Sequence, residues 1–236
     1  NTIQPISVID TEEDMDLMDP ELPPYDEIWY TSTTGEVVPL QSSSGFGAKV
    51  VSNTYENGKG VIKFDGIVTA VGDGAYNGYS PNHTLETVTI PTSVTSIGAL
   101  AFRHCTSLRD INLHDDITYI GERAFIYTDL SEVTIPKGLT ELSKQIFDST
   151  PLKSIVIPDN IKKIGEMAFC LCAKLETIVI GDGVTEIGNQ AFEIWNPSIV
   201  SVTLGKNVTV MGNNVFDGCT GTLILTGNIP SNSSDG

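Results

Sequence analysis

The stretch LETVTIPTSVTSIGALAFRHC, residues 85–105, decides the fold of this chain. It is the clearest copy of a phrase that recurs between residues 61 and 225, with an aromatic residue at the same place in seven copies. Successive aromatics are 22 to 26 residues apart, and a fixed period in this range is typical of a solenoid. The column consists of Tyr76, Phe102, Phe125, Phe147, Phe169, Phe192 and Phe216.

Each copy begins with an alternation of apolar and polar residues, which predicts a strand with one buried face. Stacking of successive copies makes these strands parallel, at a spacing of about 4.8 Å. We therefore expect about seven coils with a parallel β-sheet along one face. The predicted inward pairs are Ile62/Phe64, Val88/Ile90, Ile111/Leu113, Val133/Ile135, Ile155/Ile157, Ile178/Ile180 and Val202/Leu204.

A glycine recurs four residues before the aromatic, at Gly98, Gly121, Gly165, Gly188 and Gly212. A glycine kept at one place indicates a corner that needs positive φ or a close approach of two backbones. Ser143 interrupts this column, so we infer that the corner does not strictly require glycine. The Ala-Phe step that follows predicts a short helical or 3₁₀ turn on the face opposite the sheet.

Four segments follow from these patterns. Residues 1–26 are acidic and form an N-terminal linker; residues 27–60 form a small β capping module; residues 61–225 form the solenoid; residues 226–236 form a polar tail. Within the module, residues 27–32 and 36–40 predict one hairpin. Residues 49–55 and 61–64 predict a second hairpin, joined by Asn57-Gly58, a strong hairpin turn signal.

The chain of 236 residues carries a formal charge of −17, and residues 1–48 hold ten acidic side chains with no Lys or Arg. Such a chain is repelled by phosphate backbones, which excludes nucleic acid as a partner. An acidic surface favours solubility, so we expect a monomer. We also expect no transmembrane segment, because no apolar run approaches the ~20 residues that a membrane helix needs.

The phrase Leu-x-x-Ile-x-Ile-Pro-x-x-Val-x-x-Ile-Gly-x-x-Ala-Phe-x-x-Cys resembles the BspA-like leucine-rich repeat family of the treponemal type, over roughly residues 60–225. The segment from Ile28 to Gly60 is similar to the module that often precedes these repeats. The resemblance implies a leucine-rich repeat solenoid and an extracellular or outer-surface location. Since the chain starts at Asn1, we expect that a signal or lipoprotein leader has been removed. The family has no shared catalytic residues.

Three of the four cysteines, Cys105, Cys172 and Cys219, occupy one repeat column. Their coils are about 14 and 10 Å apart at the strand spacing, beyond the ~7 Å limit for a disulfide. We therefore expect small buried thiols and no disulfide. Cys170 falls in a column of mostly charged residues, which predicts an exposed free thiol. No metal-ligand spacing is present, so the sequence predicts no cofactor and no metal site.

Two surfaces are candidates for binding. On the outward strand positions, Asp110, Asn112, Glu132 and Thr134 form a polar exception among Thr and Val residues, although β-propensity alone explains most of that face. Along the edge after the aromatic, Tyr127 and Trp195 interrupt a polar pattern. Trp195 stands where other copies carry a small residue, so it either points outward as an interface anchor or packs locally over a widened corner.

These observations predict a non-enzymatic protein that recognises another protein, as an adhesin for host or bacterial surface proteins. A glycan-binding module is the first alternative, because Trp195 beside Asn196 offers an aromatic platform with an amide. A structural spacer of a surface assembly is the second alternative, which the bland Thr/Val face supports. No motif with the spacing of a nucleophile, a base and a metal ligand supports an enzyme.

Overall fold

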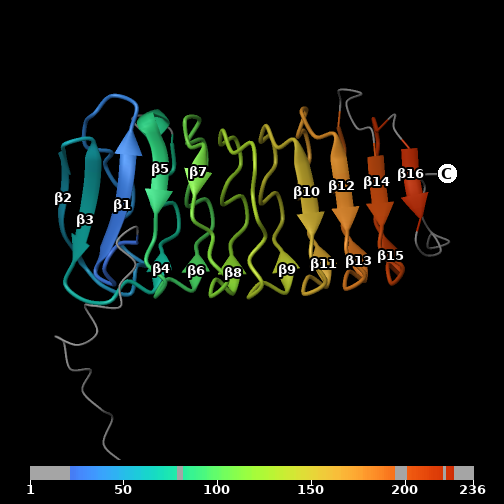
Figure 1. Ribbon diagram of the computed structural model, residues 1–236, viewed down its shortest axis with the longest axis horizontal. Coiled ribbons are helices and arrows are strands. Elements are labelled where there is room, and N and C mark those ends of the chain that lie inside the picture. Colours follow the sequence, from blue (N-terminus) through green and yellow to red (C-terminus); the bar gives the residue numbers. More distant parts are fainter. Residues whose placement is uncertain (1–21, 79–81, 195–200, 220–221, 226–236) are drawn as a thin grey trace, which may run out of the picture.

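The protein is an elongated stack of coils in which strands line one long side (Figure 1). This computed structural model describes residues 22–78, 82–194, 201–219 and 222–225. Most of the predicted linker at 1–26, and all of the tail at 226–236, therefore lie outside the described residues. In the described part of the chain, no helix is long and apolar enough to span a membrane.

Two rows of strands run along the stack. The main strand row consists of β5 (Leu85–Thr89), β7 (Asp110–Ile111), β10 (Ser154–Ile157), β12 (Thr177–Ile180), β14 (Ser201–Leu204) and β16 (Thr222–Leu225). The short strand row consists of β4 (Ala70–Val71), β6 (Ser96–Ile97), β8 (Tyr119–Ile120), β9 (Glu141–Leu142), β11 (Lys163–Ile164), β13 (Glu186–Ile187) and β15 (Val210–Met211). All pairs within both rows are parallel, which confirms the predicted stacking.

The N-terminal module confirms one predicted hairpin and corrects the other. β2 (Val50–Glu56) and β3 (Lys59–Phe64) are antiparallel and joined by Asn57 and Gly58, both with positive φ. β1 (Glu27–Ser32) does not pair with residues 36–40, because it lies between β3 and β5 and pairs antiparallel with both. Residues 36–40 form no strand; Val38 is instead buried, and its N–H donates to the Tyr30 hydroxyl at 3.2 Å.

The aromatic column is the core of the solenoid. Its rings stack face to face, with centroids 5.1 to 5.6 Å apart and interplanar angles of 3 to 20°. The first six members are fully buried, and Phe216 at the end of the stack is half-buried. The apolar strand residues pack against this column, so one repeated residue sets which side of every coil faces inward.

The first member of the column carries a polar group that its neighbours lack. Tyr76 is completely buried, and its hydroxyl has no hydrogen-bond partner among the described residues. Burial raises the pKa of this phenol well above its usual value, so the group stays neutral. We expect Tyr76→Phe to stabilise the protein by about 1–3 kcal/mol, the cost of an unsatisfied buried group. Urea denaturation measures this, and a loss of stability would show that the hydroxyl has a partner in solution.

The face opposite the sheet is built from turns rather than the predicted helical segments. The single 3₁₀ helix of the described ranges is η2 (Asn82–Thr84). In five of the turns, the residues two positions before and two after the aromatic both have positive φ, which interrupts any helix; Leu100 and His104 are one such pair. Their N–H groups donate to the next coil, at 3.0 Å to Glu122 O and 2.9 Å to Ile126 O. Bonds between coils thus replace bonds within a helix.

The cysteines are largely enclosed by the stack. Cys105, Cys170 and Cys172 are buried and Cys219 is half-buried, and none of the four forms a disulfide. The exposed position predicted for Cys170 is therefore wrong. Its column also holds Asp148 and Glu193, which are buried themselves, so the charge of the neighbouring residues gave a misleading signal. Burial and these two carboxylates raise the pKa of Cys170 to about 12.

Thiol labelling of the folded protein tests this burial. We expect a thiol reagent at neutral pH to modify Cys219 first, because the other three side chains are at most 6% exposed. Burial also raises the pKa of Cys172 to about 12, which leaves almost no reactive thiolate. Mass spectrometry after brief labelling measures the order, with denatured protein as the control in which all four react. Fast modification of Cys105 or Cys172 would contradict the enclosed core.

Candidate functional site

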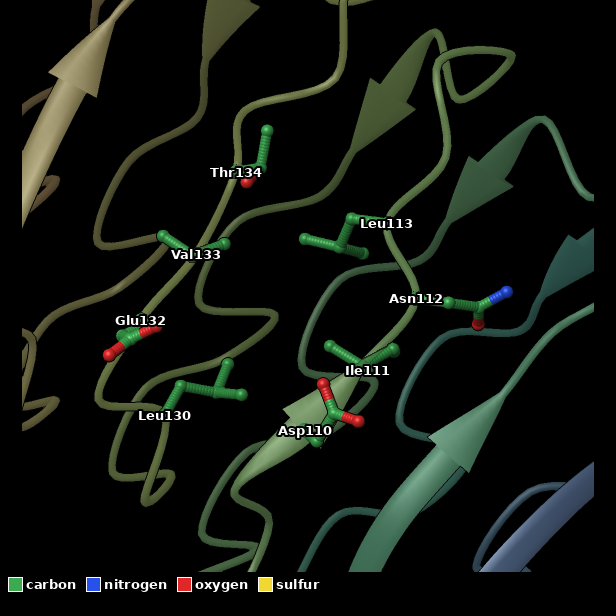
Figure 2. Close-up of a pocket in the computed structure, with 8 residues that line it drawn as sticks. All are labelled: Asp110, Ile111, Asn112, Leu113, Leu130, Glu132, Val133 and Thr134. Atoms are coloured by element: carbon green, nitrogen blue, oxygen red, sulfur yellow. The ribbon is translucent and has the colours of Figure 1, made fainter.

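A groove opens in the strand face between two successive coils (Figure 2). Its volume is about 310 Å³. One coil supplies residues 110–113 and the next supplies Leu130 and residues 132–134. Asp110, Asn112, Glu132 and Thr134, the four residues predicted on the strand face, all line this groove. The structure therefore brings together four side chains that the sequence places on neighbouring strands.

The groove lies where both strand rows are interrupted. In the main strand row, β7 has two residues and no strand forms at residues 130–135, so the sheet stops at β7 and resumes at β10. In the short strand row, β8 and β9 belong to different sheets. In the main strand row of Figure 1, no arrow is accordingly drawn between β7 and β10, whereas β8 and β9 lie in the short strand row. Among the described junctions, the one between residues 108–128 and 130–150 thus lacks the pairs of both strand rows, whereas the next junction lacks those of the main row and keeps the pairing of β9 with β11.

The interruption coincides with Ser143, the exception in the glycine column. At the regular corners the glycine N–H donates to the preceding coil, as from Gly165 to Leu142 O and from Gly188 to Ile164 O, both at 2.8 Å. A Cβ on Gly188 would lie 2.6 Å from Glu166 N, so there is no room for a side chain. Close backbone approach, rather than positive φ, is therefore the reason for glycine.

Ser143 carries a side chain where this approach leaves no space. Its hydroxyl donates to Ile120 O, in the place that the main-chain N–H fills elsewhere. The bond from residue 140 to Thr118 O, which has equivalents at the other junctions, is also missing among the described residues. We infer that the serine side chain keeps the two coils apart on the strand side. The corner tolerates serine, as the sequence predicts, but the main-chain hydrogen bonds between these two coils are lost on the strand side.

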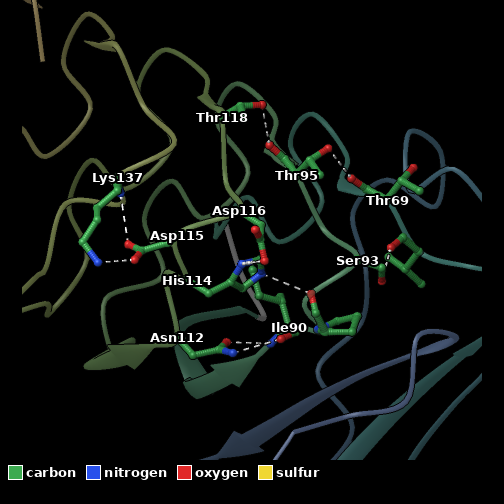
Figure 3. Close-up of polar contacts among 12 residues, drawn as sticks. Thr69, Ile90, Ser93, Thr95, Asn112, His114, Asp115, Asp116, Thr118 and Lys137 are labelled. Atoms are coloured by element: carbon green, nitrogen blue, oxygen red, sulfur yellow. Dashed lines mark hydrogen bonds and ion pairs between the residues drawn. The ribbon is translucent and has the colours of Figure 1, made fainter. Parts of the chain in front are cut away.

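The opposite side of the same junction stays closed. Phe125 and Phe147 stack with centroids 5.4 Å apart, as in the rest of the column. The Phe125 N–H donates to Ile146 O at 3.0 Å. Between the two strand rows, the Lys137 N–H donates to Asp115 Oδ1 at 3.1 Å. The side chains of the same two residues form an ion pair at 2.5 Å (Figure 3). The groove is thus open at the strand face and closed at the aromatic column, where the two coils stay in contact.

Asn112 has a structural role that the sequence does not reveal. Its Nδ2 donates to Ile90 O at 2.9 Å, and its Oδ1 accepts from Ile90 N at 2.7 Å (Figure 3). The side-chain amide therefore takes the place of a strand neighbour for β5. This occupies the amide and leaves it half-buried, so Asn112 positions its coil and offers little to a partner.

The remaining groove residues are available to a ligand. Asp110, Glu132 and Thr134 are exposed. Within the described ranges, neither carboxylate has an ion-pair partner, unlike Glu86, which pairs with Arg109 one coil away. The floor is apolar, since Leu113 and Val133 are half-buried where their counterparts in regular coils are buried. The groove thus combines two unneutralised negative charges with an accessible apolar floor.

Tyr127 does not belong to this groove. Trp195 lies outside the described residues. Tyr127 is 43% exposed and stacks on His104, with ring centroids 4.5 Å apart. Partial burial, the charge of Arg103 and His83 lower the pKa of His104, so this imidazole is neutral at pH 7 and stacks as an uncharged ring. The pair forms a small aromatic surface separate from the groove.

A second groove of about 560 Å³ follows the glycine corners along the short strand row. Its acidic side chains are partly neutralised by lysines, with Lys144 bonded to Glu166 at 2.8 Å and Lys163 to Glu186 at 2.7 Å. Sequence reasoning misses this groove, although the glycine column marks its floor. No group of three potential metal ligands occurs in the part of the chain that the structure describes.

Comparisons with known proteins agree with this architecture. The model of the BspA type leucine rich repeat region matches residues 69–194 and 140–233, in six copies. A search of curated proteins finds no match. A leucine rich cell surface protein from Faecalibacterium prausnitzii has a similar structure, with a TM-score of 0.60 and 27% identity, covering 69% of this chain and 44% of that one.

The T. pallidum leucine rich repeat protein is also similar, with a TM-score of 0.58 and 32% identity, covering 66% of this chain and 73% of that one. The chain therefore spans less than half of the first relative and about three quarters of the second. Solenoids of this kind act as binding scaffolds for proteins. Because the family model covers more than half of the 236 residues, this chain belongs to the BspA-type leucine-rich repeat family.

Proposed function

We propose that this chain is an exported, non-enzymatic repeat protein that recognises another protein at a bacterial surface, with host proteins as the first class of target. The observation that carries the proposal is the groove at Asp110 and Glu132, where a regular strand face gives way to exposed, unpaired carboxylates over an apolar floor. Polar rims around an accessible apolar centre are typical of protein interfaces. The F. prausnitzii relative is described as a cell surface protein, which supports the location.

A binding screen with matched charge variants tests this function. Purified protein is presented to extracellular host proteins and to a glycan array, beside the double variant Asp110→Lys/Glu132→Lys. The control is Glu36→Lys/Glu176→Lys, which makes the same change in charge at exposed positions outside the groove. We expect binding to a protein, at least tenfold weaker in the groove variant and unchanged in the control.

Three results would contradict the proposal. Binding to glycans alone, lost on Tyr127→Ala or Trp195→Ala and kept in the groove variant, would assign the protein to carbohydrate recognition at the aromatic surfaces. Equal protein binding by the groove variant and the control would place the interface elsewhere. Absence of binding in both screens would favour the spacer role.

A further inference from the structure

The main chain beside the groove has hydrogen-bonding groups without partners. In regular coils the strand residues pair with both neighbours, as β12 does with β10 and β14. Residues 132–135 pair with neither neighbouring coil, and among the described residues their N–H groups make no hydrogen bond. The segment is therefore an open strand edge inside the sheet, a site at which another extended chain can add.

The coil that faces residues 132–135 across the groove is bonded to β5 on its other side. There β7 pairs with β5, and the Asn112 amide bonds to Ile90, while the Leu113 N–H bends back to Ile111 O at 3.0 Å. The edge to which a further strand adds is therefore taken as the one that carries Glu132 and Thr134. The tie between Asp115 and Lys137 limits the groove at one end, so its length is that of residues 130–134, or about 16 Å at ~3.3 Å per residue.

The charges around this edge select the kind of chain that adds. Asp110 and Glu132 are exposed and unpaired on either side of the groove. A strand that presents Lys or Arg at alternate positions places its cations on one face, and arginine binds a carboxylate with two parallel hydrogen bonds. The protein's own residues 1–48 are unsuited, because they hold ten acidic side chains and no basic one. A second copy of the −17 chain is repelled in the same way.

We infer that the groove binds an extended basic segment of the partner protein, which pairs through its main chain with residues 132–135 and places cationic side chains at Asp110 and Glu132. This inference rests on the proposed function and names the chemistry of the partner. Main-chain pairing supplies affinity and the carboxylates supply selectivity. The footprint is about five residues, as the length of the groove requires.

Short peptides test the inference without the natural partner. The probe is the blocked peptide acetyl-Thr-Arg-Thr-Arg-Thr-amide. The matched controls are its Thr-Glu counterpart and a version with alternate backbone nitrogens methylated, which keeps the charge and removes main-chain donors. Amide NMR spectra of the full chain are followed at millimolar peptide. We expect saturable shifts at residues 110–113 and 130–135, at least tenfold weaker binding of the methylated peptide, and no binding of the acidic one.

Two variants test separately the charge at the groove and the access of the peptide to the main chain. Glu132→Lys is expected to abolish the shifts, with Glu176→Lys as the exposed control outside the groove. Ser143→Gly is expected to close the groove and weaken binding at least tenfold, although it leaves both carboxylates in place. Equal binding of the methylated peptide, or no saturable shift, overturns the inference. The proposed function then still stands if the Asp110→Lys/Glu132→Lys variant has lost a partner protein in the screen, so the two failures are distinguishable.

Discussion

Phe169→Ala is expected to lower the free energy of unfolding by about 3–5 kcal/mol, the usual cost of removing a buried aromatic ring. Phe169 is fully buried in the column and stacks on Phe147 and Phe192, with centroids 5.6 and 5.1 Å away. The substitution leaves a cavity and removes two ring contacts in one step. Urea denaturation followed by circular dichroism measures the loss.

The matched control for this substitution is Phe216→Ala, at the end of the same column. Phe216 is half-buried, and the structure shows a stacking partner on one side, Phe192 at 5.6 Å. Less apolar surface and fewer contacts are lost there, so we expect a clearly smaller effect. Equal losses at the two positions would indicate that the column does not carry the stability of the solenoid.

Gly188→Ala is expected to destabilise the protein by about 1–3 kcal/mol, because the new methyl group meets backbone rather than a movable side chain. An alanine Cβ lies 2.6 Å from Glu166 N and 2.8 Å from Gly165 C, so the two coils must move apart. The bond from the residue 188 N–H to Ile164 O, at 2.8 Å, is stretched as a result. Thermal unfolding measures the change in stability.

Ser143→Gly is the complementary variant. It is expected to bring two coils closer together, whereas Gly188→Ala moves two coils apart. Without the side chain, the residue 143 N–H can approach Ile120 O as the other corner glycines approach theirs. Hydrogen exchange at residues 140 and 143 reports this approach directly. We expect slower exchange at both in the variant, and unchanged exchange would show that Ser143 does not cause the opening.

Much of this architecture could be predicted from the sequence because two periods coincide. The alternation of two within each strand fixes which side chains point inward, and the period of about 23 residues fixes which strands are neighbours. Glu132-Val133-Thr134-Ile135 has the same alternation as the other strands, yet it forms none. We attribute the opening of the groove to Ser143, eight residues later and in another part of the coil, so no local pattern reveals it.

The candidate site was predictable in its residues but not in its shape. Asp110, Asn112, Glu132 and Thr134 stand out by polarity alone, and they line one groove. Polarity does not reveal that the Asn112 amide binds the backbone at Ile90, because an exposed and a backbone-bonded asparagine look alike in a sequence. The course of β1 was equally hidden, since any alternating segment suits either edge of a sheet.

The single serine among the corner glycines also has a mechanical consequence. In stacked-repeat proteins each coil is held only by its neighbours, so the overall cohesion is set junction by junction. The junction between residues 108–128 and residues 130–150 has lost the hydrogen-bonded pairs of both strand rows. Tension along the long axis is therefore expected to part the molecule at this joint before any other of the described junctions, which divides one solenoid into two blocks that yield separately.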